Sequence, residues 1–400
     1  MDTSITHSTP PKAGLVWVVI ALALGTFALG TTEFASMTMV PYIAENLGVG
    51  VEHVSYAISA YALGVVVGSP IIMVMTVRVR RRKLLLILTA AMAIANGLSA
   101  LSPSLGWLVF FRFLSGLSHG AYFGTAMLLA ASLVPSTMKA RVMSQVFLGL
   151  TIATIAGVPL ATWMGQNIGW RWSFVMVTLL FIMAAIMIYV FAPNPPAKEG
   201  ASPLKELETL KSREVWYTLG IAAIGGGGLF CVYTYLSETL RQVTHAPAAW
   251  IPIMMVIFGL GSTIGNLVSG WAADKSTMKA ALFILIFSAI VLAIYPSAAG
   301  SLLTLVPVVF LIGCSIGLAA IIQPRLMDIA PEGQAMAGAL VQCAFNLANA
   351  IGPWAGSLVI TAGFSIADTG YAASFLSVCG LAMWWLAMRE GKKKALQPER

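Results

Sequence analysis

The sequence has few charged residues: 38 of 400 positions, of which 23 are Lys or Arg and 15 are Asp or Glu. A soluble domain carries about a quarter charged residues, so the composition excludes an ordinary soluble protein. Proline (19) is no more frequent than average and cysteine (4) is scarce, which excludes collagenous, disordered and disulfide-stabilised classes. Apolar residues make up 58%, and we therefore expect most of the surface to lie in lipid.

Motifs of enzyme chemistry are missing as well. There is no glycine-rich phosphate loop ending in Gly-Lys-Ser/Thr, which argues against ATP-driven chemistry. The four histidines and four cysteines do not cluster as metal ligands, and no nucleophile, base and orienting group occur together. We expect no catalytic residues, no metal and no cofactor.

Long apolar runs dominate the chain. A membrane helix needs about 20 apolar residues, whereas the alternation of a membrane β-barrel strand is not seen. The pattern predicts an all-α membrane protein with twelve transmembrane helices. Their expected ranges are 15–40, 54–77, 84–101, 105–134, 142–163, 172–191, 215–240, 250–273, 280–295, 302–322, 334–360 and 371–388.

The basic residues predict the orientation. If both termini are cytoplasmic, twenty of the 23 Lys and Arg residues fall in cytoplasmic segments, whereas Arg171 and Arg241 lie outside and Arg112 lies within a span. This is the distribution of the positive-inside rule. The net charge of +8 then reflects topology and attraction to anionic lipid, with no nucleic acid as partner. The first apolar run is too long for a cleaved signal and is expected to remain as the first span.

Six runs lie on each side of the longest hydrophilic segment. We expect an N-terminal six-helix bundle (1–193), a cytoplasmic linker (194–214) and a C-terminal six-helix bundle (215–400). A weak internal repeat with an offset of 197 supports two pseudo-symmetric bundles. It pairs Gly64, Gly68, Arg78 and Arg82 with Gly261, Gly265, Lys275 and Lys279. Such a duplication is typical of transporters whose substrate binds between the halves.

Small residues recur every four positions in spans two, five, eight and eleven. Such stripes allow helices to approach closely in lipid. They are interpreted either as plain packing or as surfaces on which the halves slide or rock.

Several segments carry a family resemblance. They are LALGTFALGTTEF (22–34), YALGVVVGSPI (61–71), RFLSGLSHGAYFG (112–124), GLTIATIAGVPLATWMGQNIGWRWSF (149–174) and AFNLANAIGPWAG (344–356). Over nearly its whole length the chain resembles the major facilitator superfamily, within it the twelve-span drug:proton antiporter group, and most closely arabinose-efflux-permease-like transporters. The resemblance implies a monomeric transporter of the bacterial inner membrane. Spans 1, 4, 7 and 10 would line its cavity, and spans 2, 5, 8 and 11 would form the interface between halves.

The resemblance also implies gating residues. The family's cytoplasmic loop motif is complete in the second half, whereas in the first half Val77 takes the place of the carboxylate. In the alternative interpretation, the arginines there are topology signals only. The span-five antiporter motif reads Gly-Val-Pro instead of Gly-Pro. The gating candidates are Arg78, Arg82, Gly149, Gly157, Pro159, Gly270, Asp274 and Lys275.

Two ionisable groups inside the membrane predict proton coupling. Glu33 and Arg112 lie about 12 and 10 Å below the outer ends of spans one and four, at 1.5 Å per residue. Pairing would satisfy both groups, and alternating exposure would let Glu33 exchange a proton. His119 lies two turns from Arg112 and could extend the relay. The alternatives are a static salt bridge and a histidine that only satisfies a hydroxyl or backbone group.

Polar and aromatic residues of the cavity spans are the substrate candidates. They are Thr31, Thr32, Phe34, Met37, Tyr122, Phe123, Phe230, Tyr233 and Thr234, with Gln342, Asn346 and Asn349 on one side of span eleven. Interhelical packing is the alternative for this amide row. Glu45, Glu238 and Arg241 are expected near water at the outer surface, without a role in a site.

Together these patterns predict a secondary transporter that exports a small organic solute, such as a sugar, a purine or nucleoside, or a drug, in exchange for protons. The energy source is the proton gradient. Two alternatives stay open: a proton-independent or symport facilitator, and a membrane receptor or scaffold that transports nothing.

Overall fold

The computed structural model describes residues 12–76, 79–135, 138–194, 208–330 and 334–396, and over these ranges the chain is almost entirely helical without any strand. The predicted linker lies largely outside the described residues. Its last part forms η4 (Glu208–Lys211) and the start of α11 (Arg213–Gly220).

The first half comprises the helices α1 to α9. Their bounds are α1 (Lys12–Thr38), α2 (Val40–Leu47), α3 (Val51–Thr76), α4 (Arg81–Ala100), α5 (Leu105–Leu117), α6 (His119–Ser132), α7 (Lys139–Ile152), η2 (Ala153–Gly157), α8 (Val158–Met164), η3 (Gly165–Gly169) and α9 (Trp170–Phe191). Both η2 and η3 are π-helical segments. Between spans five and six the chain turns at Gly169, whose φ of 105° favours glycine.

The second half begins with α11. It continues with η5 (Ile221–Gly225), α12 (Gly227–Gln242), α13 (Trp250–Lys275), α14 (Thr277–Ala298), α15 (Leu302–Cys314), η6 (Ser315–Gly317), α16 (Leu318–Ile329), α17 (Gln334–Thr361), η8 (Ile366–Asp368) and α18 (Thr369–Leu396). Spans four and ten are broken at equivalent places, at Ser118 between α5 and α6 and at η6 between α15 and α16.

Twelve spans follow from these helices. Ten described helical segments are long and apolar enough to cross a membrane. One of them, Gln145–Phe191, has 47 residues, enough for two crossings, and it holds the turn at Gly169. The broken span α5–α6 adds the twelfth, so the all-α architecture predicted from the sequence is confirmed.

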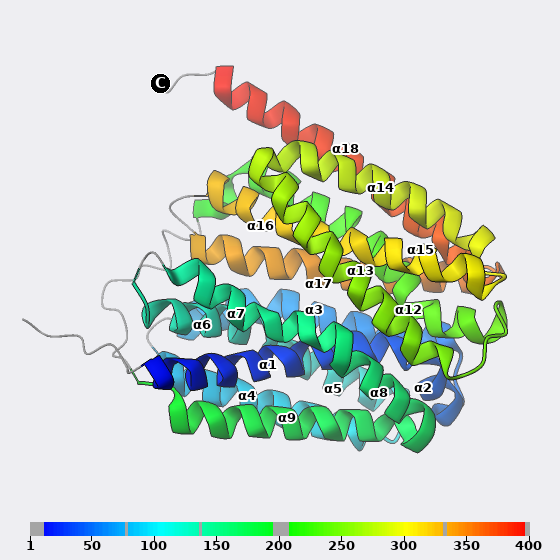
Figure 1. Ribbon diagram of the computed structural model, residues 1–400, viewed down its shortest axis with the longest axis horizontal. Coiled ribbons are helices and arrows are strands. Elements are labelled where there is room, and N and C mark those ends of the chain that lie inside the picture. Colours follow the sequence, from blue (N-terminus) through cyan, green and yellow to red (C-terminus); the bar gives the residue numbers. More distant parts are fainter. Residues whose placement is uncertain (1–11, 77–78, 136–137, 195–207, 331–333, 397–400) are drawn as a thin grey trace, which may run out of the picture.

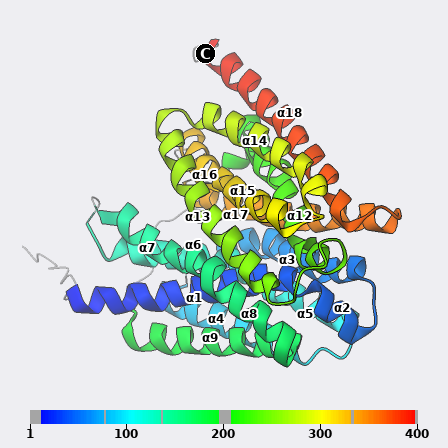
Figure 2. The same cartoon turned by 45° about the vertical axis from the view of Figure 1, so that its right-hand side comes forward.

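The two halves lie side by side. In Figure 1, α1–α9 occupy the lower part of the molecule and α11–α18 the upper part, and Figure 2 shows the same separation after a 45° turn. The N-terminal end of α1 and the C-terminal end of α18 point to the same end of the bundle, which we call the termini end. The short helix α2 lies at the opposite end, the α2 end.

The internal repeat is visible in the packing. A Cβ atom on Gly64 would lie 2.3 Å from the carbonyl oxygen of Phe113, and one on Gly261 would lie 2.1 Å from that of Phe310. Both residue pairs differ by 197 positions. Since Cβ atoms do not approach so closely, α3 against α5 and α13 against α15 require glycine at these crossings.

These glycine faces correct one interpretation of the stripes. The helices that meet across the halves include α3 with α17 and α8 with α13, as the resemblance implied. The stripe glycines of α3 (Gly64 and Gly68) and of α13 (Gly261 and Gly265), however, face helices of their own half, and Gly352 likewise faces α12. Gly259 of α13, in contrast, faces Thr154 of the first half. Most of the stripe therefore builds each bundle, whereas Gly259 lies at the contact between the bundles.

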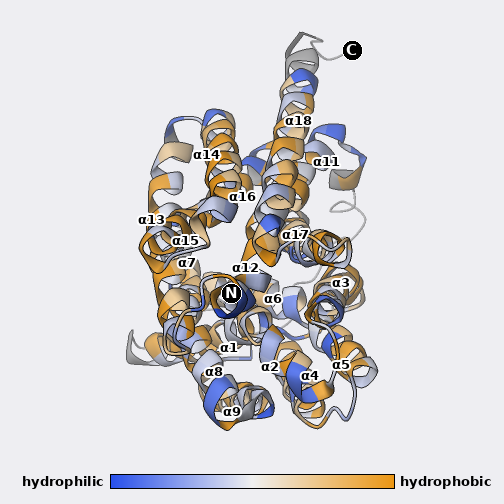
Figure 3. Cartoon of the chain, turned by 90° about the vertical axis from the view of Figure 1, so that its right-hand side faces the viewer, coloured by the Kyte–Doolittle hydropathy of each residue, from blue (hydrophilic) through white to orange (hydrophobic). Residues whose placement is uncertain are grey.

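The outer surface is apolar. Viewed from the α2 end in Figure 3, hydrophobic colour runs along most helices and hydrophilic colour gathers towards their ends. Large side chains such as Leu179 of α9, Phe283 of α14 and Phe375 of α18 are 60–70% exposed. In water such a surface would associate, so it fits contact with lipid.

Candidate functional site

Glu33 lies where the two halves meet. Its side chain on α1 is 6% exposed, and its Oε1 accepts a hydrogen bond from the Asn349 amide of α17. Residues in a helix are about 100° apart around the axis, so Glu33 faces the second half while the preceding Thr32 faces the first. Two sequence candidates, one proton-coupling and one substrate-binding, are thus brought into direct contact.

Arg112 has other partners than the expected one. The guanidinium group on α5 donates to the Thr32 hydroxyl (2.9 Å) and to the Thr32 carbonyl (3.2 Å). Its Cζ lies 4.1 Å from the centroid of the Tyr61 ring and 5.5 Å from that of Phe174, within cation–π range. Among the ion pairs of the described residues none joins Arg112 to Glu33, so the predicted direct pair is not formed in this structure.

The Arg112 contacts belong to a buried network within the first half. The Thr32 hydroxyl donates to the Asn96 side-chain oxygen (2.6 Å). The Asn96 amide in turn donates to the Ser115 hydroxyl (3.0 Å). Buried hydrogen-bonded networks of this kind fix the relative rotation of helices, here α1, α4 and α5.

His119 joins the same network through Tyr61. Its Nδ1 lies 2.7 Å from the Tyr61 hydroxyl, and the two rings are 5.8 Å apart. Because the span is broken at Ser118, Arg112 and His119 lie on different helices but share this tyrosine. The partner of His119 is a hydroxyl group, as one of the two interpretations of the sequence expected.

Tyr61 and Asn96 were missed in the sequence. Asn96 is the single amide in the apolar helix α4, and a buried amide in lipid needs partners, so it carried a usable signal. Tyr61 carried no such signal, because tyrosine is common in apolar spans and its contact with Arg112 depends on tertiary packing.

An aromatic cluster beside Glu33 joins the halves. Phe34 of α1 stacks on Phe230 and meets Tyr233 edge-on, with both centroid distances at 6.2 Å. Tyr233 also packs on Phe258, 4.3 Å away. Met37 and Thr234 are buried too, and the Thr234 hydroxyl has no hydrogen-bond partner among the described residues.

The other substrate candidates are dispersed. The Tyr122 hydroxyl donates to the Leu22 carbonyl (3.2 Å), and Phe123 packs on Phe147, so both belong to a separate hydrophobic cluster within the first half. Thr31 donates to the Phe27 carbonyl of its own helix.

The side-chain amides of α17 have two kinds of partner. Asn349 reaches across to Glu33, whereas the Asn346 amide donates to the Gln342 carbonyl of its own helix (3.0 Å). Both asparagines are 2% exposed. Their side-chain oxygens have no hydrogen-bond partner among the described residues, so two buried acceptors are available to a ligand.

The charged gating candidates lie at the termini end. Arg82 donates to the Tyr189 carbonyl and lies over its ring (5.2 Å), within the first half. Lys275 lies 3.7 Å from the centroid of the Trp271 ring. Arg78 and the side chain of Asp274 lie outside what the structure describes.

The span-five motif packs closely on α1. A Cβ on Gly149 would lie 2.1 Å from the Ala23 carbonyl, and one on Gly157 would lie 2.2 Å from the Thr31 hydroxyl. Pro159 lies near the start of α8, directly after the π-helical segment η2 of the same continuous helix. Gly270, in contrast, faces open space.

Metal ligands do not gather in the described part of the chain: no group of three or more His, Cys, Asp or Glu side chains could hold an ion.

Comparison with known proteins gives consistent matches. The family model of the Major Facilitator Superfamily matches residues 22–333. Three similar proteins are the inner membrane transport protein YdhP of Escherichia coli K12 (36% identical; 92% of this chain and 94% of that protein), the putative transporter AraJ of the same strain (30%; 94% and 96%) and the chloramphenicol resistance protein of Streptomyces lividans (31%; 83% and 86%). A similar solved structure is that of a bacterial homologue of the human lysosomal transporter Spinster, in an inward-facing and unoccupied conformation. It matches with a TM-score of 0.74 at 15% identity over 96% of this chain and 99% of that one.

Proposed function

The chain belongs to the major facilitator superfamily of transporters, and we propose that it exports a small organic solute across the bacterial inner membrane in exchange for protons, with Glu33 as the proton-binding group. One observation carries this proposal: the buried Glu33 carboxyl contacts a neutral amide of the opposite half, while the nearby arginine is held by Thr32 and Tyr61.

A neutral amide suits a carboxyl group that gains and loses a proton. An ionised carboxylate accepts from an N–H group, as Glu33 accepts from Asn349. A protonated carboxyl group can donate, and the side-chain oxygen of the same Asn349 has no partner. After rotation of the amide, the contact could persist in both protonation states, whereas an ion pair with Arg112 would stabilise only the charged form.

The contact also connects protonation to movement of the halves. Asn349 lies on α17, which packs against α3 of the first half. A proton at Glu33 therefore weakens, without breaking, a hydrogen bond between the two bodies that rock against each other in alternating access. Carboxylates within the membrane are costly and are commonly retained for such coupling.

The substrate would combine an apolar or ring-shaped body with hydrogen-bond donors. Phe34, Phe230 and Tyr233 offer aromatic faces from both halves. The unpaired side-chain oxygens of Asn346 and Asn349 call for N–H or O–H donors. Nucleosides, sugars and amphenicols have this chemistry, and one relative is named as a chloramphenicol resistance protein.

Orientation follows the basic residues. Arg82 and Lys275 lie at the termini end, which we place in the cytoplasm because the positive charges gather there. The proton gradient across the inner membrane would supply the energy, without a cofactor.

The test uses sealed vesicles with an imposed pH gradient, supplied with radiolabelled nucleosides, sugars or chloramphenicol. We expect wild-type protein to drive uptake against the solute gradient. Glu33→Gln should lose this response but keep solute exchange at equal concentrations on the two sides. Glu52→Gln is the matched control, because Glu52 is an acid of the same half that contacts His53 at the α2 end.

Equal gradient-driven flux in wild type and Glu33→Gln would contradict the coupling role. Exchange without any response to the gradient in wild type would support a facilitator. No movement of any solute would support a receptor or scaffold.

A further inference from the structure

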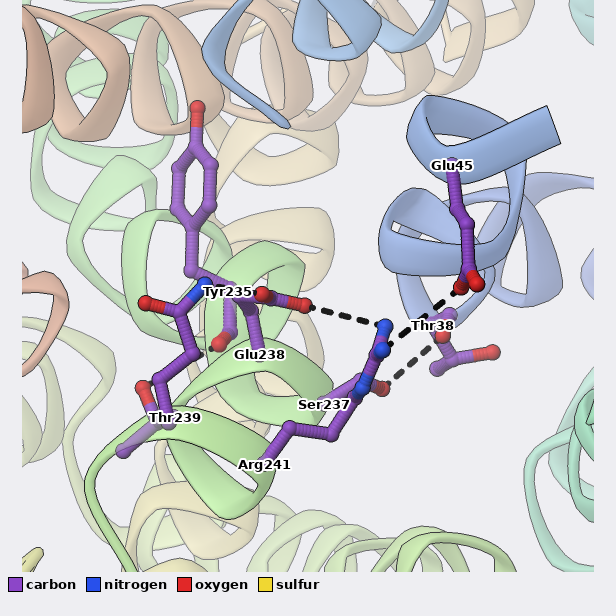
Figure 4. A network of polar contacts seen from close by, with 8 residues as sticks. Thr38, Glu45, Tyr235, Ser237, Glu238, Thr239 and Arg241 are labelled. Carbon is purple, nitrogen blue, oxygen red and sulfur yellow. Dashed lines mark hydrogen bonds and ion pairs between the residues drawn. The ribbon is translucent and has the colours of Figure 1, made fainter. Parts of the chain in front are cut away.

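Three charged residues connect the halves at the α2 end (Figure 4). Arg241, in the last turn of α12, lies 3.5 Å from Oε2 of Glu45 on α2. The same guanidinium group lies 3.6 Å from Oε2 of Glu238, one turn earlier on its own helix. Arg241 therefore bridges one carboxylate of the first half and one of the second.

The two carboxylates differ in burial. The Glu238 side chain is 6% exposed and accepts a hydrogen bond from Gln242, whereas the Glu45 side chain is 73% exposed. The expectation that Glu238 is a surface group is thus wrong, because the end of α12 is covered by the packing of the first half. A buried carboxylate separated from its cation is costly, whereas Glu45 can exchange Arg241 for water.

Further contacts between the halves surround Arg241. The Ser237 hydroxyl donates to the Thr38 carbonyl (2.8 Å), at the break between α1 and α2. Arg241 lies 5.7 Å from the centroid of the Tyr42 ring. Gln166 of η3 donates to the Ala248 carbonyl (2.6 Å), in the connection that follows α12.

At the termini end the charged groups pair differently. Arg325 binds Glu214 within the second half, and Arg82 binds the Tyr189 carbonyl within the first. The ion pair between Arg241 and Glu45, in contrast, crosses between the halves.

We infer that Arg241 is an electrostatic latch: Glu238 holds it in the second half, and it closes the α2 end by binding Glu45 and the Tyr42 ring. When the α2 end opens, Arg241 stays with Glu238 and releases Glu45. The latch sets the ratio of closed to open α2 ends. Partly exposed ion pairs are weak, so the latch can open in each transport cycle.

The experiment measures the distance between the halves directly. Ser104 and Ser301 are equivalent positions, 197 residues apart, and both are exposed at the α2 end. With the four native cysteines replaced by alanine, spin labels on Ser104→Cys and Ser301→Cys report closed and open populations by pulsed electron resonance in lipid nanodiscs. Labelled protein with the latch intact gives the reference distribution.

We expect Glu45→Gln and Arg241→Gln each to raise the ratio of open to closed populations about two- to fivefold. The double variant should equal Arg241→Gln alone, because that substitution already removes the contact with Glu45. Glu45→Gln alters an exposed side chain and should leave folding intact, so it remains informative if Arg241→Gln destabilises the protein.

Arg171→Gln is the matched control. Arg171 is also an arginine at the α2 end, but its guanidinium group binds Asn46 and the Ser102 carbonyl within its own half, so its loss should not change the ratio. An unchanged distribution in Glu45→Gln, or effects of the two substitutions that add, would overturn the latch. The measurement needs neither solute nor pH gradient, so its outcome is independent of the role of Glu33.

Discussion

The two halves share a scaffold but not a site. The glycine crossings of α3 on α5 recur 197 residues later in α13 on α15, and both spans four and ten are broken at the equivalent place. The polar network of the first half has no such copy. At the same offset, Thr32, Glu33, Tyr61, Asn96, Arg112 and His119 correspond to Leu229, Phe230, Phe258, Ala293, Val309 and Ile316.

This difference shows that helix packing is repeated in both halves, whereas the ionisable groups of this network are confined to the first. Close helix crossings must be kept in both halves, because each bundle needs them to fold in lipid. Ionisable groups are costly in hydrocarbon, so one set suffices, and the second half contributes aromatic rings and amides to the same interface. Glu33 and its counterpart Phe230 illustrate the division, since both lie beside Phe34.

The largest loss of transport is expected from a substitution of Arg112, which has an apolar counterpart, Val309, in the second half. Arg112→Met removes two charge-assisted hydrogen bonds to Thr32 and the contact with the Tyr61 ring, which lowers the free energy of unfolding by about 1–3 kcal/mol. We expect transport to fall more than roughly tenfold, because the rotation of α1 that aims Glu33 is lost.

Val309→Met at the equivalent position enlarges a buried side chain and should cost about 1–3 kcal/mol, but it should leave transport near wild type. Solute flux in vesicles and thermal unfolding in detergent measure both variants. Similar losses of transport at the two positions would show that the halves contribute equivalent chemistry.

The shared scaffold predicts matched losses of stability. Gly64→Ala and Gly261→Ala each place a Cβ against a backbone carbonyl, 2.3 and 2.1 Å away, so each should lower the stability by about 1–3 kcal/mol. Gly106→Ala is the control, because that glycine faces open space. Thermal unfolding of the three variants is the readout. Tolerance of alanine at one crossing but not at the other would contradict the equivalent packing of the two halves.

Substitutions of the two asparagines of α17 should affect transport differently. Asn349→Ala removes the partner of Glu33 from the other half and should reduce gradient-driven transport about tenfold, the effect of one hydrogen bond to a charged group. Asn346 bonds to its own helix, so Asn346→Ala should reduce the apparent solute affinity without changing the response to the gradient. Flux at several solute concentrations and pH gradients distinguishes the two. Identical profiles would contradict a specific role of Asn349.

The smallest effect is expected at Tyr61. Tyr61→Phe introduces the residue found at the equivalent position of the second half, Phe258, and keeps the ring beneath Arg112. It removes only the hydroxyl bonded to His119, at a cost of about 0.5–1.5 kcal/mol. Transport should be unchanged, and a loss of proton-coupled flux would instead place His119 in the proton path.

The helical scaffold could be predicted well from the sequence, because the patterns that determine it lie within single segments of the chain. Twelve apolar runs, the 197-residue offset and the glycine stripes are each visible along the chain, and the resemblance to the superfamily is confirmed. The break at Ser118 was not predicted, since the apolar run continues through it.

The site was predicted in composition but not in pairing. Glu33 and Arg112 were identified because charges are rare in the spans, yet their partners depend on the rotation of α1 about its axis, which spacing along one helix does not determine. For this reason the sequence did not reveal that Arg112 binds Thr32 and that Glu33 binds Asn349. Glu238 was misplaced likewise, because a residue at the end of a span is buried only if another segment covers it.

The most direct test of Glu33 as the coupling group is proton release on solute binding. Purified protein in weakly buffered detergent solution, with a pH indicator, is mixed with chloramphenicol or with whichever solute the vesicle assay identifies. The prediction is that wild type releases protons on binding, whereas Glu33→Gln binds the same solute without release. Equal release by both proteins would contradict the assignment of Glu33.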